Sequence, residues 1–166
     1  MSSQPPGPEA PLAGGQPLTA GLDEMVCFAL YSASRVATGA YREGLTRLGL
    51  TYTQYVTLLA LWEADGPSVS ELGERLQLDS GTLSPLLRRL QAAGHVERRR
   101  DHRDERRVTV HLTDQGRALE PEAAGLRQQL YDSMHLTPQE AETLRTLAQR
   151  FCHLPTPHDS NEGHTS

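Results

Sequence analysis

Apolar residues recur every three to four positions along most of the chain, which is the period of an amphipathic helix. The pattern predicts a first helix over residues 22–48, because Gly49 directly after it is a natural stop. A second helix is expected from about Thr53 to the Gly66-Pro67 pair, since such a pair interrupts helices. The length of 166 residues allows one ordinary domain and leaves no room for two full ones, and no internal repeat appears.

Two shorter helices are expected next. SVSELGERLQL predicts an amphipathic helix capped by Ser68 or Ser70. DSGTLSPLLRRLQAAG predicts a second one, capped by Asp79 or Ser80 and closed by Gly94. The tight turn between them gives the segment the order of a helix-turn-helix motif.

The period changes after Gly94. HVERRR and RRVTVHL alternate like strands, and the turn-rich DHRDE between them predicts a hairpin. Two further helices are expected: Thr113 caps the first, and Thr137 caps the second with Pro138 and Glu140 in favourable positions. The predicted fold class is therefore mainly α with a small β-hairpin wing, a winged helix-turn-helix.

The second helix of the motif is expected to bind DNA. Its start is small and polar, which lets the helix N-terminus approach base edges and phosphates, where its amide dipoles favour anions. Pro85 removes one backbone donor, and we interpret it as a proline tolerated early in the helix. The residues expected to contact DNA from this helix are Ser80, Thr82, Ser84, Pro85, Arg88 and Arg89.

The hairpin is rich in arginine, with six in the ten residues from Arg98 to Arg107. Arginine at a hairpin tip can enter a minor groove, where narrow A·T stretches attract guanidinium groups, so Arg103 and Arg106 are further candidates. Asp104 is expected to stiffen the turn through an ion pair with Arg106, as a structural residue. The alternative is a solvated surface hairpin that is simply arginine-rich.

The charge distribution supports a polyanionic partner although the formal net charge is −5. Residues 80–107 contain eight arginines and four acidic residues, a net charge of +4, which leaves −9 for the remainder. All sixteen basic side chains are arginine. Because salt screens charges beyond roughly 8 Å, an acidic body with one arginine-rich strip can still bind a polyanion locally.

The ends of the chain differ in composition from the rest. Residues 1–21 and 155–166 are expected to be a disordered arm and tail around a single domain at 22–154. We expect no secretory signal, and no apolar run approaches the ~18 residues of a membrane span. Two cysteines 125 positions apart favour a reducing cytosol, and thus a cytoplasmic protein, over a disulfide framework.

SELGERLQLDSGTLSPLLRRLQAAGHVERRRDHRDERRVTVHLTDQG resembles the MarR family of winged-helix repressors. The hairpin signature of that family is Asp104-Glu105-Arg106 followed by VHLTDQG in this chain. CFALYSASRVATGAYREGLTRLGLTYTQY is similar to the organic hydroperoxide resistance regulators, the OhrR branch. The resemblance covers about residues 22–152 and implies a MarR-like homodimer on double-stranded DNA.

Cys27 lies near tyrosines on the first predicted helix. Reactivity belongs to the thiolate, and phenol hydroxyls stabilise the charged sulfur by donating hydrogen bonds. Tyr31 is four residues on and shares the helix face of Cys27. Tyr41 is fourteen residues on, a rise of ~21 Å, so it can meet Cys27 only from another chain. The alternative is a cysteine that is an inert small hydrophobe.

The resemblance implies that two tyrosines of the opposite subunit serve the sensing thiol, and the matching positions are Tyr41 and Tyr52. Cys152 is a candidate resolving thiol that condenses with the oxidised Cys27 of the partner. In two-cysteine members we expect that residue nearer the start of the last helix, so the match is incomplete. The alternative is capping of Cys27 by a low-molecular-weight thiol.

The predicted function is a peroxide-sensing transcriptional repressor. Residues 22–48 and 113–152 are expected to form the dimer, and 53–112 the DNA-binding lobe. An organic hydroperoxide would enter an apolar pocket near Cys27, oxidise it, and release an inverted-repeat operator. The expected pocket residues are Phe28, Leu30 and Trp62.

Three alternatives stay open: a repressor that binds a small aromatic ligand noncovalently, a thiol peroxidase, and a structural DNA-binding protein without a sensor. Against a peroxidase, the chain has no loop arginine near Cys27; Arg35 on the same helix is the closest candidate. We predict no enzyme activity, no cofactor and no metal. The spacing of the histidines forms no convincing metal site: His95, His102, His111, His135 and His153.

Overall fold

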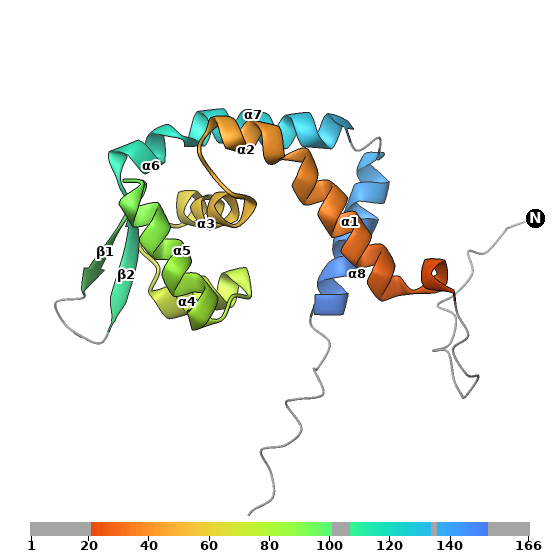
Figure 1. The fold of residues 1–166 in the computed structure, drawn as a ribbon, viewed down its shortest axis with the longest axis horizontal. Helices are drawn as coiled ribbons and strands as arrows, with labels where there is room; N and C mark the ends of the chain where they lie inside the picture. Colours follow the sequence, from red (N-terminus) through yellow and green to blue (C-terminus); the bar gives the residue numbers. More distant parts are fainter. Residues whose placement is uncertain (1–20, 101–106, 134–135, 153–166) are drawn as a thin grey trace, which may run out of the picture. The chain divides into compact units, whose positions relative to one another are not determined.

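The computed structural model describes residues 21–100, 107–133 and 136–152. Its helices and hairpin follow each other in the expected order (Figure 1). The chain divides into two units, Met1–Val36 and Ala37–Ser166. Within the described ranges, no helix combines the length and the apolar character that a membrane crossing requires.

The first unit contains a short 3-10 turn, η1 (Leu22–Glu24), and most of helix α1 (Val26–Ala40). The prediction of one continuous helix over 22–48 is wrong, because the helix breaks at Tyr41 before α2 (Arg42–Arg47). Gly39 lies two residues before the break, and glycine destabilises a helix through its backbone entropy.

The expected helix-turn-helix is present in the second unit. Its two helices are α4 (Val69–Leu76) and α5 (Ser80–Ala92), and α3 (Tyr52–Glu63) precedes them. The N-caps of α4 and α5 are Ser68 and Asp79, which confirms one of the two candidates for each helix. Pro85 is the sixth residue of α5, so it lies in the second turn, deeper than expected.

The hairpin consists of β1 (Val96–Arg100) and β2 (Val108–Leu112), paired antiparallel. The chain between α3 and α4 pairs with the other edge of β2: the Gly66 amide donates to the Val110 carbonyl (3.1 Å) and the Val110 amide to the Pro67 carbonyl (2.9 Å). This extra pairing attaches the wing to the helices.

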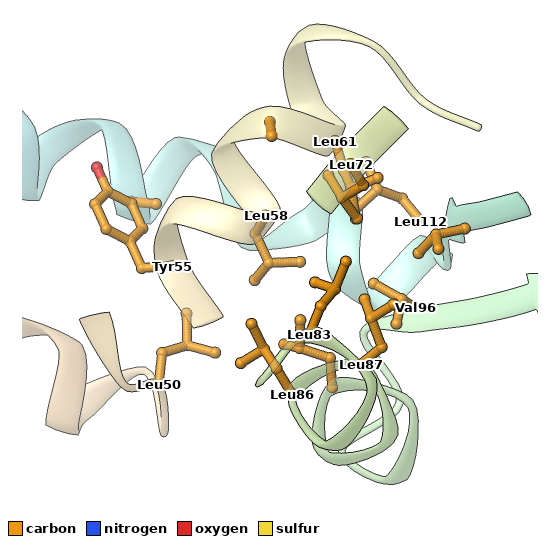
Figure 2. Close-up of a cluster of buried hydrophobic side chains, with 14 of the residues drawn as sticks. Leu50, Tyr55, Leu58, Leu61, Leu72, Leu83, Leu86, Leu87, Val96 and Leu112 are labelled. Atoms are coloured by element: carbon orange, nitrogen blue, oxygen red, sulfur yellow. The ribbon is translucent and has the colours of Figure 1, made fainter. Parts of the chain in front are cut away.

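A leucine-rich core holds the helix-turn-helix and the hairpin together (Figure 2). α5 contributes leucines at helical spacing, as its sequence predicts, and they pack against side chains of α3, α4 and both strands. Burial of each such leucine contributes roughly 2 kcal/mol. The most deeply buried apolar residues include Leu58, Leu61, Leu72, Leu83, Leu87, Leu90, Val96 and Val110.

Two helices follow the hairpin where one was expected. Thr113 is the N-cap, as predicted, but α6 (Asp114–Ala118) ends before α7 (Glu120–Ser133) begins. Pro121 explains the break, because it has no amide hydrogen to donate and its ring crowds the carbonyl of Arg117, four residues earlier. The sequence contained this signal, and the prediction of one helix missed it.

The last helix, α8 (Pro138–Cys152), confirms its predicted start. The Thr137 amide donates to the Glu140 carboxylate (2.8 Å), and the Glu140 amide donates to the Thr137 hydroxyl (3.3 Å). These bonds satisfy amides that the first helical turn leaves without partners.

Candidate nucleic-acid interface and thiol sites

The N-terminus of α5 is occupied by the carboxylate of Asp79. One carboxylate oxygen accepts the Thr82 amide (2.9 Å) and the other accepts the Thr82 hydroxyl (2.9 Å). The bonds from the Thr82 side chain and backbone lower the pKa of Asp79, so it stays charged. The Thr82 amide and hydroxyl are therefore engaged at the helix end where phosphates were expected. Ser80 is exposed there and Ser84 is half-buried.

Arg88 and Arg89 are exposed on α5. In the part of the chain that the structure describes, neither side chain forms a hydrogen bond or an ion pair. A guanidinium without a partner can bind a phosphate without first breaking a bond in the protein. Of the predicted DNA-contact residues that the structure describes, these two are the best placed for electrostatic binding.

Some of the hairpin arginines form hydrogen bonds within the protein. Arg98 Nε donates to Gln91 Oε1 near the end of α5 (2.9 Å), and Arg107 donates to both carboxylate oxygens of Glu71 on α4 (3.1 and 3.2 Å). These bonds hold the wing against the two helices of the motif. Counting arginines in the sequence therefore overstated the number that are free to meet DNA.

The predicted contacts at the hairpin tip, Arg103 and Arg106, and the predicted turn residue Asp104 lie outside the described residues. A pocket of about 460 Å³ lies between the hairpin strands and the helices α4 and α5. No pattern in the sequence indicated this pocket. Its lining residues are Ser68, Val69, Ser70, Ser84, Leu87, Arg98, Arg107 and Val108.

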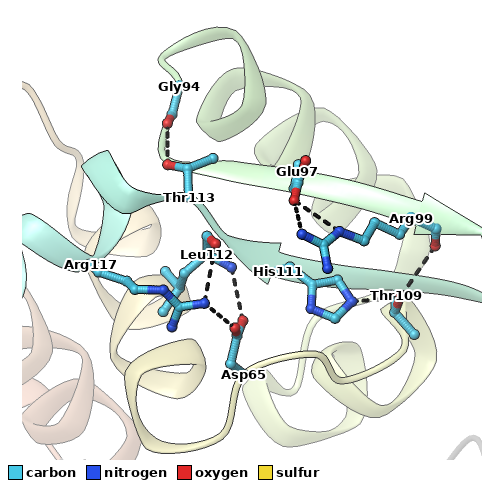
Figure 3. A network of polar contacts seen from close by, with 9 residues as sticks. All are labelled: Asp65, Gly94, Glu97, Arg99, Thr109, His111, Leu112, Thr113 and Arg117. Atoms are coloured by element: carbon cyan, nitrogen blue, oxygen red, sulfur yellow. Dashed lines mark hydrogen bonds and ion pairs between the residues drawn. The ribbon is translucent and has the colours of Figure 1, made fainter.

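A polar network joins the chain that follows α3, the hairpin and α6 (Figure 3). One carboxylate oxygen of Asp65 accepts the Leu112 amide (2.8 Å), and the other accepts Arg117 (2.6 Å). The Thr113 hydroxyl donates to the Gly94 carbonyl (2.5 Å). The start of α6 is thus attached both to the chain after α3 and to the chain after α5.

Asp65→Asn is expected to lower the free energy of unfolding by about 1 kcal/mol at neutral pH, because it removes the ion pair with Arg117. Burial raises the pKa of Asp65, but the hydrogen bonds from Leu112 and Arg117 and the charge of Arg117 outweigh it, so that pKa lies below its ordinary value. The carboxylate therefore stabilises the fold above its unfolded-state pKa, and this contribution is lost as the pH falls through the folded-state pKa.

Urea unfolding of both proteins between pH 7 and pH 3 measures the effect. The difference in unfolding free energy should be constant above about pH 5 and shrink below about pH 4. A difference that stays the same at all pH values would contradict the role of the charged carboxylate.

The two cysteines are exposed and free. Cys27 is the second residue of α1, and Cys152 is the last residue of α8. Tyr31, on the same face of α1 as Cys27, accepts a hydrogen bond from Arg35 (3.3 Å), whose guanidinium lies 5.6 Å from the ring centre. Helix α1 ends at Ala40, directly before Tyr41.

Tyr41 and Tyr52 lie ring to ring, with centroids 5.5 Å apart. Tyr41 is the residue at the break between α1 and α2, and Tyr52 is the first residue of α3. The fold therefore brings together the two tyrosines that were predicted to serve one thiol. A third ring, that of Tyr55, contacts both and was not predicted from the sequence.

The predicted pocket residues lie in different parts of the chain. Phe28 and Leu30 are half-buried on α1. Trp62 is half-buried on α3, and its indole nitrogen donates to the Gly116 carbonyl (3.0 Å). Trp62 therefore has a structural contact of its own, and its place in a ligand pocket stays a prediction.

The two histidines that the structure describes, His95 and His111, lie in surroundings typical of a structural role. His95 is buried, and burial lowers its pKa, so it is neutral at physiological pH. His111 forms a hydrogen bond with the Thr109 hydroxyl (2.9 Å). Among the described residues, no three His, Cys, Asp or Glu side chains gather as metal ligands would. His102, His135 and His153 lie outside that part of the chain.

The known proteins that are similar to this chain in sequence are transcriptional regulators. The family model of the transcriptional regulator SarA/Rot matches residues 40–122, half of the chain. The HTH-type transcriptional regulator TtmR of Methylorubrum extorquens is 57% identical over 98 residues, which cover 59% of this chain and half of that relative. The organic hydroperoxide resistance transcriptional regulator of Bacillus subtilis is 38% identical over 141 residues, 84% of this chain and 94% of that protein.

Solved structures of related regulators are also similar to this chain. Reduced AbfR bound to DNA is 32% identical, with a TM-score of 0.68 over 81% of this chain and 94% of that one. AbfR has also been solved in an overoxidized form on DNA and in a disulfide form. From its winged helix-turn-helix and these relatives, the chain belongs to the MarR family of winged-helix transcriptional regulators.

Proposed function

We propose that the protein is a homodimeric repressor that senses organic hydroperoxides by oxidation of Cys27 and then releases its operator. The observation that carries the proposal is the pair of phenols, Tyr41 and Tyr52, with rings 5.5 Å apart. The 38% sequence identity with the Bacillus subtilis hydroperoxide regulator, over most of both chains, supports it. AbfR, a relative with reduced and disulfide forms, is a precedent for thiol oxidation in this fold.

Exposed apolar side chains support a dimer. They lie on α1 and α8, the helices predicted to dimerise, and an apolar surface of this kind is unfavourable in water unless a partner covers it. A second copy satisfies both helices at once through two-fold symmetry. The exposed apolar residues of the two helices are Val26, Tyr31, Val36, Leu144, Leu147 and Phe151.

The dimer also supplies what one helix lacks. On one straight helix, the fourteen positions between Cys27 and Tyr41 correspond to a rise of ~21 Å, which no side chain spans. In the proposed dimer, the sulfur of one subunit receives hydrogen bonds from Tyr41 and Tyr52 of the partner subunit. Phenol donors stabilise the thiolate without adding a fixed charge to the interface.

The proposed reaction is a two-electron oxidation of Cys27 Sγ. The thiolate attacks the terminal oxygen of the hydroperoxide, an S–O bond forms and the O–O bond breaks. The sulfur becomes a sulfenic acid, and the peroxide leaves as an alcohol after its alkoxide takes a proton. A second thiol then attacks the sulfenic sulfur, forms a disulfide and releases water. That thiol is Cys152 of the partner subunit or a low-molecular-weight thiol.

DNA binding uses two lobes related by the dimer axis. In each lobe α5 enters a major groove, and Arg88 and Arg89 bind phosphates. Two-fold symmetry requires an inverted repeat with half-sites about one helical turn apart. Loss of the thiolate and formation of the disulfide change the interface, and the two helices α5 lose the separation that fits the operator.

The test compares the wild type with Cys27→Ser on an inverted-repeat operator, before and after one equivalent of an organic hydroperoxide. The wild type should lose affinity by roughly 5–150-fold, the usual range of such coupling. The Cys27→Ser protein should bind as well as the reduced wild type and stay bound, because serine has no oxidisable sulfur. Cys152→Ser is the matched control, and mass spectrometry identifies the second thiol.

Release of Cys27→Ser by the hydroperoxide would contradict the covalent mechanism and favour noncovalent ligand sensing. Peroxide consumption separates the switch from a thiol peroxidase. A switch uses one equivalent per subunit, whereas sustained turnover with excess thiol would identify an enzyme. Equal affinity for an inverted repeat and for random DNA would instead indicate a structural DNA-binding protein.

A further inference from the structure

Tyr55 lies at the centre of an aromatic cluster in the second unit. Its ring centroid is 5.5 Å from that of Tyr41 and 6.5 Å from that of Tyr52, with tilts of 43° and 59°. Tyr55 is only 1% exposed, whereas Tyr52 is 37% exposed. One buried ring therefore supports two rings that reach the surface of the subunit.

A second contact fixes Tyr55 from another side. The Trp62 ring meets it edge-on at 6.5 Å, and the Trp62 indole nitrogen is held by the Gly116 carbonyl (3.0 Å). Both aromatic residues lie on α3, whose leucines form the core. Figure 2 shows Tyr55 at the side of this core, with its hydroxyl directed away from Leu58. The ring of Tyr55 thus has little freedom to move.

We propose that Tyr55 is a positioning residue whose ring sets where the hydroxyls of Tyr41 and Tyr52 lie, and thereby sets the reactivity of Cys27 in the partner subunit. The inference rests on the proposed function. It adds a residue that does not touch the sulfur and acts only through the two phenols.

The physical reason is the narrow geometry of the hydrogen bonds involved. A phenol stabilises a thiolate only within a small range of distance and angle, and a displacement of about 1 Å lowers a rate by up to roughly 100-fold. Tyr41 sits at the break between two helices and Tyr52 at the first residue of another, positions where the backbone alone constrains a ring weakly. Packing against Tyr55 supplies the missing constraint.

The experiment uses the full-length reduced protein and tert-butyl hydroperoxide, and measures the rate of Cys27 oxidation from pH 5 to pH 9. Tyr55→Leu should slow oxidation at neutral pH by roughly tenfold or more and move the pH profile of the rate to higher pH, while operator binding stays within about twofold of the wild type. Tyr55→Phe keeps the ring and should match the wild type within about twofold.

Leu61→Ala is the matched control, since it cuts another fully buried side chain of α3 that is no part of the aromatic cluster. It should lower thermal stability without moving the pH profile. If Tyr55→Leu does not fold, Tyr55→Met replaces it, because methionine fills the volume with a flexible chain. An unchanged rate and pH profile in the folded variant would overturn the inference, as would equal slowing by Tyr55→Phe or by Leu61→Ala.

The double variant Tyr41→Phe with Tyr52→Phe separates this inference from the function on which it rests. It keeps all three rings and removes the two donors. If it oxidises as fast as the wild type, the proposed role of the phenols fails, and the inference with it. If it is slow while Tyr55→Leu is fast, only the positioning role of Tyr55 is wrong.

Discussion

Gly116→Ala is expected to lower the free energy of unfolding by about 3 kcal/mol or more, enough to unfold a large share of a marginally stable domain. A Cβ atom at this position would lie far inside van der Waals contact with the carbonyl oxygen of His95, and it would also meet the Leu112 side chain at 3.3 Å. The first of these neighbours is backbone, which cannot rotate away.

Neither side of this contact is free to move. The His95 carbonyl accepts the Thr113 amide (3.1 Å), and the Gly116 amide donates to the Thr113 hydroxyl (3.1 Å). The Gly116 carbonyl holds the indole of Trp62. Any shift that makes room for a methyl group therefore breaks bonds between the hairpin, α6 and α3.

Urea unfolding measures the effect, with Gly125→Ala as the matched control. Gly125 lies inside α7, and a Cβ built there has no neighbour within 4 Å. Alanine at that position should stabilise the protein by about 0.5–1 kcal/mol through helix propensity. Equal behaviour of the two variants would contradict the close packing at Gly116.

The double variant Arg88→Ala with Arg89→Ala is expected to weaken operator binding by roughly tenfold or more at moderate salt. Both side chains are exposed on α5, and within the described ranges they have no protein partner, so their whole charge is available to phosphates. Each lost phosphate contact lowers the slope of log affinity against log salt by about 1, so the slope should fall by about 2 per lobe.

Fluorescence anisotropy with labelled operator at several salt concentrations tests both numbers. Arg145→Ala is the control, because this arginine lies on α8 and pairs with Glu142 of the same helix. It should leave affinity and salt slope unchanged. If the double variant binds the operator as tightly as the wild type, and only its response to peroxide differs, then α5 does not bind DNA through these arginines.

Local signals in the sequence predicted most of the secondary structure. The caps Thr113 and Thr137 and the alternation of the two strands were identified correctly, because a cap or a strand pattern depends on residues only a few positions apart. Two breaks were missed, at Tyr41 and before Pro121. At both places the helical period continues on either side of the break, so the effect of Gly39 and of Pro121 was not recognised.

The candidate site was predicted less completely. The sequence and its resemblance to a family singled out Tyr41 and Tyr52, and the fold brings their rings together. Their pairing with Cys27 stays a prediction, since it needs a second subunit. The arginine count of the hairpin also needed correction, because the partners of Arg98 and Arg107 are on other elements.

Helical period, caps and strand alternation are encoded within short windows of the chain, so the winged helix-turn-helix could be predicted from them. Which distant side chains meet could be learned only from the folded chain. The Trp62 indole donates a hydrogen bond to the Gly116 carbonyl, 54 positions away, and Asp65 pairs with Arg117, 52 positions away. The ring of Tyr55 packs against that of Tyr41, which lies between α1 and α2. Contacts of this length depend on how the helices pack, and no local pattern in the chain records that packing.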